Sequence, residues 1–224
     1  MTTFQRARSE EQRQLRRRAI LDTTAAMCDE MPASAVSLNE IGRRVGLAKS
    51  NVLRYFDSRE EILLELLDQD WQRWTNDLPA LLGASMRPKA DLAERGRAFA
   101  ATLTRSLAAD RRLCDLLSAQ AGVLEHNVSP EVAAKYKRAA LANVDALAAL
   151  IREHLPELHD RATRLCAQIV LVIGAVWIHS QPSRAMLTAY EADPSLAALR
   201  MEFAPTLEDM VATLIAGTPA GAAS

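Results

Sequence analysis

The sequence predicts an all-α fold, and composition, cap signals and hydrophobic spacing agree on it. Of the 224 residues, 40 are Ala and 31 are Leu, and both residue types favour helices. Aromatic residues make up only 4% of the chain, with 8 Gly and 9 Pro. This composition argues against β-sandwiches and barrels, which need aromatic and β-branched strands with frequent Gly and Pro turns. A chain of this length can bury a core without disulfides or a metal ion.

Three capping boxes, each a Ser followed three residues later by Glu or Gln, predict where the first helices begin. They lie at residues 9–12, 37–40 and 58–61. The helices expected from them span residues 9 to about 31, 37 to 46, and 59 to about 82. The second helix should end at Gly46, because Gly readily adopts the left-handed conformation that closes many helices.

The segment between Gly46 and Ser58 has room for a turn and a short helix only. Val52 and Phe56 share one side of that helix at i, i+4, which leaves Lys49 and Arg54 to point elsewhere. A short helix, a tight turn containing Gly and a second short helix form the helix-turn-helix arrangement, in which the second helix enters the DNA major groove.

The rest of the chain has a helical apolar pattern throughout, interrupted only by weak breaks. These breaks are at Pro79, Pro88, residues 125–130, Pro156 and residues 181–183. No Gly/Ser linker separates the two parts of the chain. We therefore expect a helix-turn-helix domain at residues 1–57, a larger helical domain at residues 58–217 and a frayed tail at residues 218–224.

Charge is divided unevenly along the chain. Residues 1–56 hold ten Lys and Arg against six Asp and Glu, whereas residues 57–224 hold seventeen against twenty-two. A basic segment joined to an acidic one is compatible with the first part meeting a polyanion, although a solvated basic helix face would look the same.

The stretch AILDTTAAM and the later stretch SLNEIGRRVGLAKSNVLRYFDSREEILLELL resemble the DNA-binding domain of the tetracycline-repressor (TetR) family. The resemblance covers roughly residues 15–67. It rests on the spacing of Ile20, Ile41 and Gly46, on the pair Tyr55-Phe56, and on the Arg-Glu-Glu opening of the next helix.

The resemblance implies roles for individual residues. Asn51 and Arg54 match positions that read base edges, where Asn pairs well with adenine and Arg with guanine. The resemblance implies phosphate contacts for Ser37, Tyr55 and Arg59, and a phosphate or base contact for Lys49. Arg17 is taken from the run Arg16 to Arg18, which could instead be a solvated face. The predicted DNA-binding residues are Arg17, Ser37, Lys49, Ser50, Asn51, Arg54, Tyr55 and Arg59.

Three positions depart from the family pattern. Ala48 stands where Ser or Thr is common, Leu53 where Tyr is common, and Ser50 where Gly is frequent. Tyr55 could also be a half-buried core residue. The alternative function is a helical small-molecule-binding protein that has lost DNA binding, and Ala48 and Leu53 support it best.

The helix expected at about residues 160–180 is apolar nearly all round between Ile169 and Ile178, so it must be covered on most sides. A second subunit could cover it in a two-fold four-helix bundle together with the last helix, as the resemblance also implies. The alternative is an inner core helix. The predicted dimer interface consists of Leu165, Ile169, Val172, Val176, Leu207, Met210 and Leu214.

A regulator also needs a binding site for the effector that controls it. Polar or aromatic residues on otherwise apolar faces are the candidates, because a buried amide must find hydrogen bonds that a ligand could supply. The alternative is that these side chains are satisfied by neighbours or are simply core. The predicted effector residues are Trp74, Phe99, Gln120, Tyr136, Asn143 and Trp177, with Gln168 also considered.

Other classes of function find little support in the sequence. The four His show no metal-binding spacing, and no GxSxG, GxGxxG or P-loop motif occurs, so we expect no enzyme, no cofactor and no metal site. The three Cys are scattered, which favours a reducing compartment. The apolar run at residues 166–178 is too short for a bilayer, and no signal peptide is recognisable, so we expect a cytoplasmic protein without a membrane partner.

Together these observations predict a homodimeric transcriptional regulator, most simply a repressor. Its expected partners are a near-palindromic double-stranded DNA operator and a small apolar or amphipathic effector.

Overall fold

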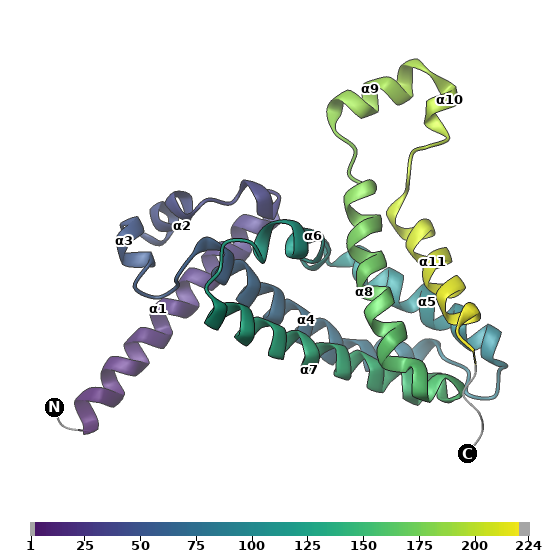
Figure 1. Cartoon of the computed structure of the whole chain (residues 1–224), viewed down its shortest axis with the longest axis horizontal. Helices are drawn as coiled ribbons and strands as arrows, with labels where there is room; N and C mark the ends of the chain where they lie inside the picture. The colour runs from purple at the N-terminus through teal and green to yellow at the C-terminus, as the bar shows by residue number, and fades with distance from the viewer. Residues whose placement is uncertain (1–2, 220–224) are drawn as a thin grey trace. The chain divides into compact units, whose positions relative to one another are not determined.

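The structure is a computed structural model that describes residues 3–219, and every regular element in this range is helical. Figure 1 shows the order of these helices along the chain. Their bounds are α1 Thr3–Glu30, α2 Leu38–Val45, α3 Lys49–Val52, α4 Arg59–Ser85, α5 Leu92–Ala109, α6 Arg111–Ala119, α7 Pro130–His154, α8 Ala162–His179, α9 Arg184–Ala192, α10 Pro194–Ala197 and α11 Phe203–Gly217. Three short helical turns lie at Ala33–Ala35, Gln120–Leu124 and Pro156–Arg161. The predicted all-α class is confirmed.

The chain divides into two compact units. The first comprises Met1–Gln69 and Ala119–Arg138, and the second comprises Asp70–Ser118 and Ala139–Ser224. Helices α4 and α7 each contribute residues to both units. The predicted domain boundary after residue 57 stays a prediction. Of the predicted tail, residues 220–224 lie outside the described range, and α11 ends at Gly217.

Apolar side chains of α1 to α4 form the core of the first unit. Ile20, Met27, Ile41, Val52 and Phe56 are all buried. Helix α1 begins at Thr3, so the predicted helix start at residue 9 is wrong. The Gln, Arg and Ala residues that precede Ser9 are themselves good helix formers, which allows the helix to continue past the capping-box pattern.

The cap signals around α2 are confirmed. The Ser37 hydroxyl accepts a hydrogen bond from the Glu40 amide at 3.2 Å, as a capping box requires. Gly46 follows the helix with φ +74°, a left-handed conformation that favours glycine. Gly42 lets the turn approach closely, because a Cβ there would lie 2.7 Å from the Leu47 carbonyl oxygen. These two glycines set the tight turn between α2 and α3.

The second unit is built around α11, which packs against α5 and against α8. Gly96 on α5 permits the close approach, because a Cβ there would lie 2.7 Å from Cγ2 of Ile215. Phe99, Leu103 and Ile173 are completely buried in this unit. These contacts fix one face of α8 toward the core of its own chain.

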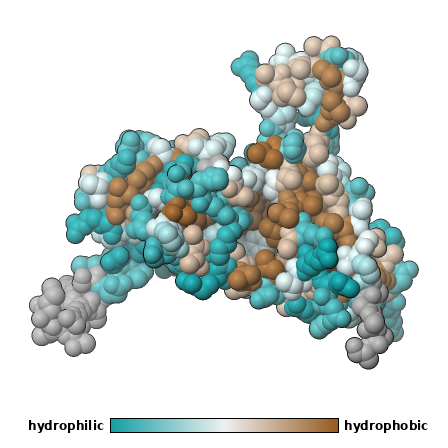
Figure 2. All heavy atoms as spheres, in the orientation of Figure 1, coloured by the Kyte–Doolittle hydropathy of each residue, from teal (hydrophilic) through white to brown (hydrophobic). Residues whose placement is uncertain are grey.

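Helix α8 is more apolar than its own chain can cover. Leu165, Ile169 and Val176 are buried, whereas Leu171 is 74% exposed and Ile178 is 60% exposed. By length and composition alone Pro156–His179 is long enough to cross a membrane, whereas the nearly apolar run within it spans only residues 166–178. The core helix of a globular protein passes the same test. Figure 2 shows hydrophobic residues gathered on this part of the second unit.

A helical arm connects α8 to α11. It consists of α9 and α10, and Figure 1 shows both standing clear of α5, α8 and α11. Ser183 and Asp193 cap the two helices through the amides of Met186 and Ser195. No residue of either helix is buried within the chain. The sequence predicted only a break at residues 181–183.

Candidate nucleic-acid interface and effector residues

Helix α3 and the residues that follow it as far as Phe56, together called the α3 segment, present polar side chains outward on an apolar base. Lys49, Asn51 and Arg54 are exposed, whereas Val52 and Phe56 are buried against the first unit. The helical turn is held by backbone hydrogen bonds from Leu53 N to Lys49 O at 3.1 Å and from Phe56 N to Val52 O at 3.3 Å. Ser50 is also exposed. The buried pair therefore fixes the tilt of the segment and leaves its polar residues accessible.

No described side chain neutralises the positive charge on this segment. Within residues 3–219, neither Lys49 nor Arg54 forms an ion pair. On α2 the opposite holds. Arg43 and Arg44 bind Glu40, and these hydrogen bonds lower the pKa of its carboxyl group to about 2. Among the described residues, the cations of the α3 segment thus have no ion-pair partner, whereas those of α2 do.

Arg17 is engaged inside the first unit. Its guanidinium donates to the Tyr55 carbonyl oxygen, forms a 2.6 Å ion pair with Glu65, and lies 4.0 Å from the centre of the Phe56 ring. These three partners hold α1 against the end of the α3 segment and against α4. Because the guanidinium of Arg17 already has these partners, the arrangement disfavours the predicted phosphate contact. Arg17 acts instead as an internal brace of the first unit.

Of two other predicted phosphate contacts, Arg59 has protein partners and Tyr55 is partly covered. Arg59 donates to the Ala33 carbonyl oxygen at 2.8 Å and lies 3.3 Å from Glu60. Tyr55 is half-buried. The exposed polar surface is therefore smaller than predicted, and it is made by Ser37, Lys49, Ser50, Asn51 and Arg54.

The departures from the family pattern have local consequences. Ala48 is the N-cap of α3 and supplies no side-chain hydrogen bond to the helix. Leu53 is 41% exposed. An apolar side chain therefore lies on the surface at the position where the family commonly has Tyr, whose hydroxyl can bind phosphate. The motif is complete in its backbone despite both changes.

The predicted effector residues fall into separate groups. In the second unit, the Trp74 indole donates to Ser106 at 2.9 Å and packs edge-on against Trp71, with ring centres 5.2 Å apart. The Trp71 indole in turn donates to the backbone oxygen of Asn143 at 3.2 Å. Trp74 and Asn143 are thus linked through Trp71, a residue that the sequence analysis missed.

Trp177 belongs to another cluster of the second unit. Its ring centre lies 5.1 Å from that of Phe203, and its indole lies 3.4 Å from Asp115. Phe99 is completely buried. The remaining two residues, Gln120 and Tyr136, lie in the first unit, where Gln120 donates to Glu125 at 3.0 Å. Burial raises the pKa of the Tyr136 hydroxyl, which keeps it protonated.

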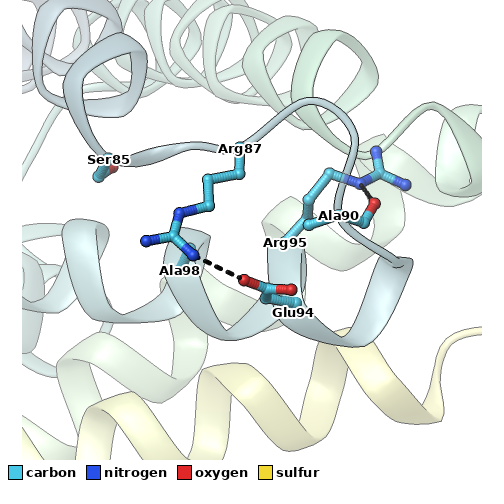
Figure 3. Close-up of a pocket in the computed structure, with 6 residues that line it drawn as sticks. All are labelled: Ser85, Arg87, Ala90, Glu94, Arg95 and Ala98. Carbon is cyan, nitrogen blue, oxygen red and sulfur yellow. Dashed lines mark hydrogen bonds and ion pairs between the residues drawn. The ribbon is translucent and has the colours of Figure 1, made fainter.

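A pocket of 310 Å³ lies at the corner between α4 and α5, and none of the six predicted effector residues lines it. Figure 3 shows Arg87 reaching toward Glu94 across this pocket, at 3.5 Å, while the Arg95 guanidinium turns away to the Ala90 carbonyl oxygen. Its lining is Ser85, Arg87, Ala90, Glu94, Arg95 and Ala98. The sequence signal was the charge cluster after Pro88, which the analysis treated only as a break.

A buried ion-pair network joins α4 to α6 within the second unit. Asp70 is 1% exposed and accepts two hydrogen bonds from Arg112, at 2.6 Å and 2.9 Å. Arg73 binds the same carboxylate at 2.6 Å and also reaches Asp110 at 2.7 Å. Sequence reasoning missed this network, because residues 70 and 112 are far apart along the chain.

The predicted dimer residues divide between the two faces of their helices. Leu165, Ile169, Val176 and Leu207 are buried in the single chain and have no surface left for a partner. Val172 and Leu214 are half-buried, and Met210 is 42% exposed. The structure therefore shifts the surface available to a second subunit toward Leu171, Ile178 and Met210.

Among the described residues, no group of three or more His, Cys, Asp or Glu side chains is arranged to hold a metal ion. The cysteines Cys28, Cys114 and Cys166 are buried and form no disulfide bond among the described residues. Burial raises the pKa of the Cys166 thiol to about 12.

Solved structures with a similar fold were found over most of the chain. The fatty acid degradation regulator FadR of Bacillus halodurans is 15% identical, with 89% of this chain and 93% of that chain covered and a TM-score of 0.52. A TetR/AcrR-family regulator of Thermobifida fusca is 19% identical, with 90% and 97% covered and a TM-score of 0.51. FadR of Bacillus subtilis in complex with stearoyl-CoA is 15% identical, with 89% and 97% covered and a TM-score of 0.51. No curated protein sequence matches.

Two family descriptions match the sequence itself. Residues 20–66 match the bacterial regulatory proteins of the tetR family. Residues 68–222 match the tetracyclin repressor-like C-terminal domain. The second match alone spans more than half of the chain, and the first coincides with the helix-turn-helix described above. The chain therefore belongs to the TetR family of bacterial regulatory proteins.

Proposed function

We propose that this protein is a cytoplasmic transcriptional repressor that binds a near-palindromic operator as a dimer and is released by a small apolar or amphipathic effector. The observation that carries the proposal is the α3 segment. There Lys49, Asn51 and Arg54 are exposed and the two cations form no ion pair with the described side chains, while Val52 and Phe56 anchor the segment. Arg and Asn at such a position can read base edges, and Lys can bind phosphate.

A dimer supplies the symmetry of the proposed operator. Two recognition segments related by a two-fold axis read half-sites about one helical turn apart, or about 34 Å. The exposed residues Leu171, Ile178 and Met210 offer the apolar surface for that contact.

The effector acts through helix α4 in this proposal. Helix α4 is continuous from Arg59 to Ser85 and has residues in both units, so a change in its direction alters the setting of the recognition segment. A ligand produces this change only if it binds one conformation more tightly than the other. Stearoyl-CoA is a suitable first probe, because it is an amphipathic molecule and is the ligand in the similar B. subtilis FadR structure.

The decisive experiment is selection of a bound sequence from a random duplex pool, followed by fluorescence anisotropy on the selected DNA over a salt series. We expect a palindrome, and an affinity that falls steeply with salt because cations released from phosphate drive binding. Arg54→Ala should weaken binding about tenfold or more and relax base preference at one position per half-site. Lys49→Ala should reduce the salt dependence.

The matched control is Arg87→Ala, which removes an arginine that is 83% exposed in the second unit. It should leave DNA affinity unchanged. Weak binding to all sequences that Arg54→Ala does not alter would overturn the proposal and favour a small-molecule-binding protein that has lost DNA binding. The missing side-chain cap at Ala48 and the exposed Leu53 are the features that support this second function.

A further inference from the structure

The pocket at the corner between α4 and α5 has one wall that is fixed by a buried arginine. Arg95 is 8% exposed, and its guanidinium donates to the Ala90 carbonyl oxygen at 3.1 Å and to the His154 carbonyl oxygen at 2.9 Å. It also forms an ion pair with Glu157. These contacts tie the start of α5 to the turn before it and to the end of α7.

A chain of hydroxyl groups fixes the opposite wall. The Ser85 hydroxyl lies 2.7 Å from that of Thr102 and donates to the Leu81 carbonyl oxygen at 3.0 Å. Arg105 donates to the Thr102 hydroxyl at 3.2 Å. The polar groups that α4 and α5 turn toward each other here are thus occupied by partners within the chain.

The turn that crosses the mouth of the pocket has a fixed backbone. The Ala90 amide donates to the Arg87 carbonyl oxygen at 3.0 Å, which closes a four-residue turn. Pro88 occupies the second position of this turn, where its ring fixes φ. The turn therefore sets the point from which the Arg87 side chain starts.

The side chain of Arg87 is loosely held, in contrast to the walls. It is 83% exposed, and its partner Glu94 is 50% exposed. Their nitrogen and oxygen atoms lie 3.5 Å apart, whereas charged hydrogen bonds are typically about 2.7–2.9 Å long. Within residues 3–219 this is the only side-chain contact of Arg87. Figure 3 shows the pair spanning the pocket. Exposed ion pairs of this kind are weak, so Arg87 can exchange its partner.

The charges around the pocket favour an anion. Residues 85–98 hold four Lys and Arg against two Asp and Glu. The Asp91 carboxylate is used as the cap of α5, where it accepts from the Glu94 amide at 2.7 Å. Lys89 is exposed and forms no ion pair among the described residues. An incoming negative group thus meets an excess of positive charge.

We propose that this pocket binds a small molecule through a carboxylate or phosphate group, which replaces Glu94 as the partner of Arg87. The planar guanidinium can donate two parallel hydrogen bonds to either group. Glu94 is exposed enough to turn into water when it is displaced. A volume of 310 Å³ accommodates a molecule of about ten non-hydrogen atoms. None of the predicted effector residues lines this site, and the inference does not depend on the proposed DNA binding.

The first test is an NMR titration of the full chain, followed at the Nε–H signals of its arginines. The probes are glutarate and glycerol 3-phosphate, which carry a carboxylate and a phosphate on molecules of similar size. We expect at least one of them to shift the Arg87 signal, which is assigned by its loss in Arg87→Gln, and the tighter probe identifies the preferred anionic group. Glycerol, which is neutral, should not shift it.

Isothermal titration calorimetry with the tighter probe then compares three variants. Arg87→Gln should raise the dissociation constant about tenfold, because it removes a charged hydrogen-bond donor. Glu94→Gln should lower it about threefold, because the competing negative charge is gone. Arg184→Gln is the matched control. It removes an exposed arginine of α9 that does not line the pocket, and it should leave the constant unchanged.

Four results would overturn the proposal. An unmoved Arg87 signal with both probes would show that the pocket binds neither anion, and an equal shift with glycerol would show that it does not select for charge. Equal dissociation constants for Arg87→Gln and Arg184→Gln would reduce the effect to general surface charge. Weaker binding by Glu94→Gln would show that Glu94 does not compete with the anion for Arg87.

Discussion

Arg17 and Arg54 carry the same guanidinium group in the same unit, but their surroundings give them different tasks. Arg54 is exposed and has no ion-pair partner among the described residues, so its charge is available to DNA. Arg17 is held by Glu65, by the Tyr55 carbonyl oxygen and by the Phe56 ring. The sequence shows two arginines near one motif, and only the contacts of each side chain distinguish the internal brace from the proposed DNA contact.

Arg17→Ala should lower the free energy of unfolding by about 2 kcal/mol, because charged hydrogen bonds of this kind contribute about 1.5–3 kcal/mol each. Urea denaturation measures the change. Arg18→Ala is the matched control, since Arg18 is exposed on the same helix, and it should change stability by no more than about 0.5 kcal/mol. If Arg17→Ala instead kept full stability and reduced the salt dependence of DNA binding, Arg17 would be the phosphate contact first predicted.

Asp70 has a comparable stabilising role in the second unit. Asp70→Ala leaves Arg112 without its bidentate carboxylate, and breaking a buried ion pair from one side costs about 3–5 kcal/mol. We expect the midpoint of thermal unfolding to fall by several degrees. The exposed carboxylate of Asp77 on the same helix gives the comparison, because Asp77→Ala should have little effect. Equal effects of the two substitutions would contradict the role of the Asp70 network.

At the scale of the element, the helix-turn-helix depends on two glycines for different reasons. Gly46 takes a left-handed φ of +74°, and Gly42 leaves room for the Leu47 carbonyl oxygen. The first was predictable, because Gly at a helix end is a local signal. The second was not, because close approach depends on how the turn folds back on α2.

Gly42→Ala places a Cβ 2.7 Å from a backbone oxygen, so the turn must shift. We expect a loss of about 1–3 kcal/mol of stability, as for other overpacked sites, together with weaker DNA binding. Gly83→Ala on α4 has open space around the new Cβ and should stabilise the protein by up to about 1 kcal/mol. Chemical denaturation should therefore show a lower free energy of unfolding for Gly42→Ala and a higher one for Gly83→Ala. A change of the same sign in both variants would contradict this explanation.

Helix α2 should also respond to acid in a defined way. Hydrogen bonds from Arg43 and Arg44 lower the pKa of Glu40 from its ordinary 4.5 to about 2. The folded state therefore gains stability from ionised Glu40 above pH 4.5 and loses that gain as the pH falls toward 2. An NMR titration of the Glu40 side chain should show a midpoint near 2. Arg44→Ala should raise this midpoint, and also that of Glu30, which Arg44 lowers too; an unmoved midpoint would show that the contacts are not made in solution.

The elements were predictable where their signals are local. Ser37 and Gly46 marked the ends of α2 correctly, because each acts on amides or carbonyls within one turn. The start of α1 was predicted wrongly, since Ser9 resembles a cap but is preceded by residues that also favour helix. The arm was missed because its two helices are short and their apolar residues have no core within the chain to pair with.

At the scale of the whole molecule, the sequence was right about class and family but not about which faces meet. Because α8 is apolar on all sides, its sequence does not indicate which side faces the core. In the structure Leu165 and Ile169 are buried, whereas Leu171 is exposed. The predicted effector residues are likewise divided between the two units, with Gln120 and Tyr136 in the first and the other four in the second. The direction of a helix face depends on its neighbours, which a single sequence does not specify.

Leu171→Glu should therefore convert the proposed dimer to a monomer, because a charge would be buried at the centre of the contact. We expect affinity for the full palindrome to fall more than tenfold, while affinity for a single half-site stays the same. Anisotropy with the two DNA lengths measures both values, and Leu141→Glu serves again as the exposed control. A variant that remains dimeric would place the subunit contact elsewhere.

The uncovered side of α8 also links folding to the amount of protein present. A single chain leaves Leu171 and Ile178 in water, and in the proposed dimer a second copy that covers them would stabilise the folded form by mass action. The melting temperature then rises with protein concentration, and a cell that makes few copies holds them closer to unfolding and to proteolysis. A low concentration of the protein would in this way increase the rate at which it is degraded.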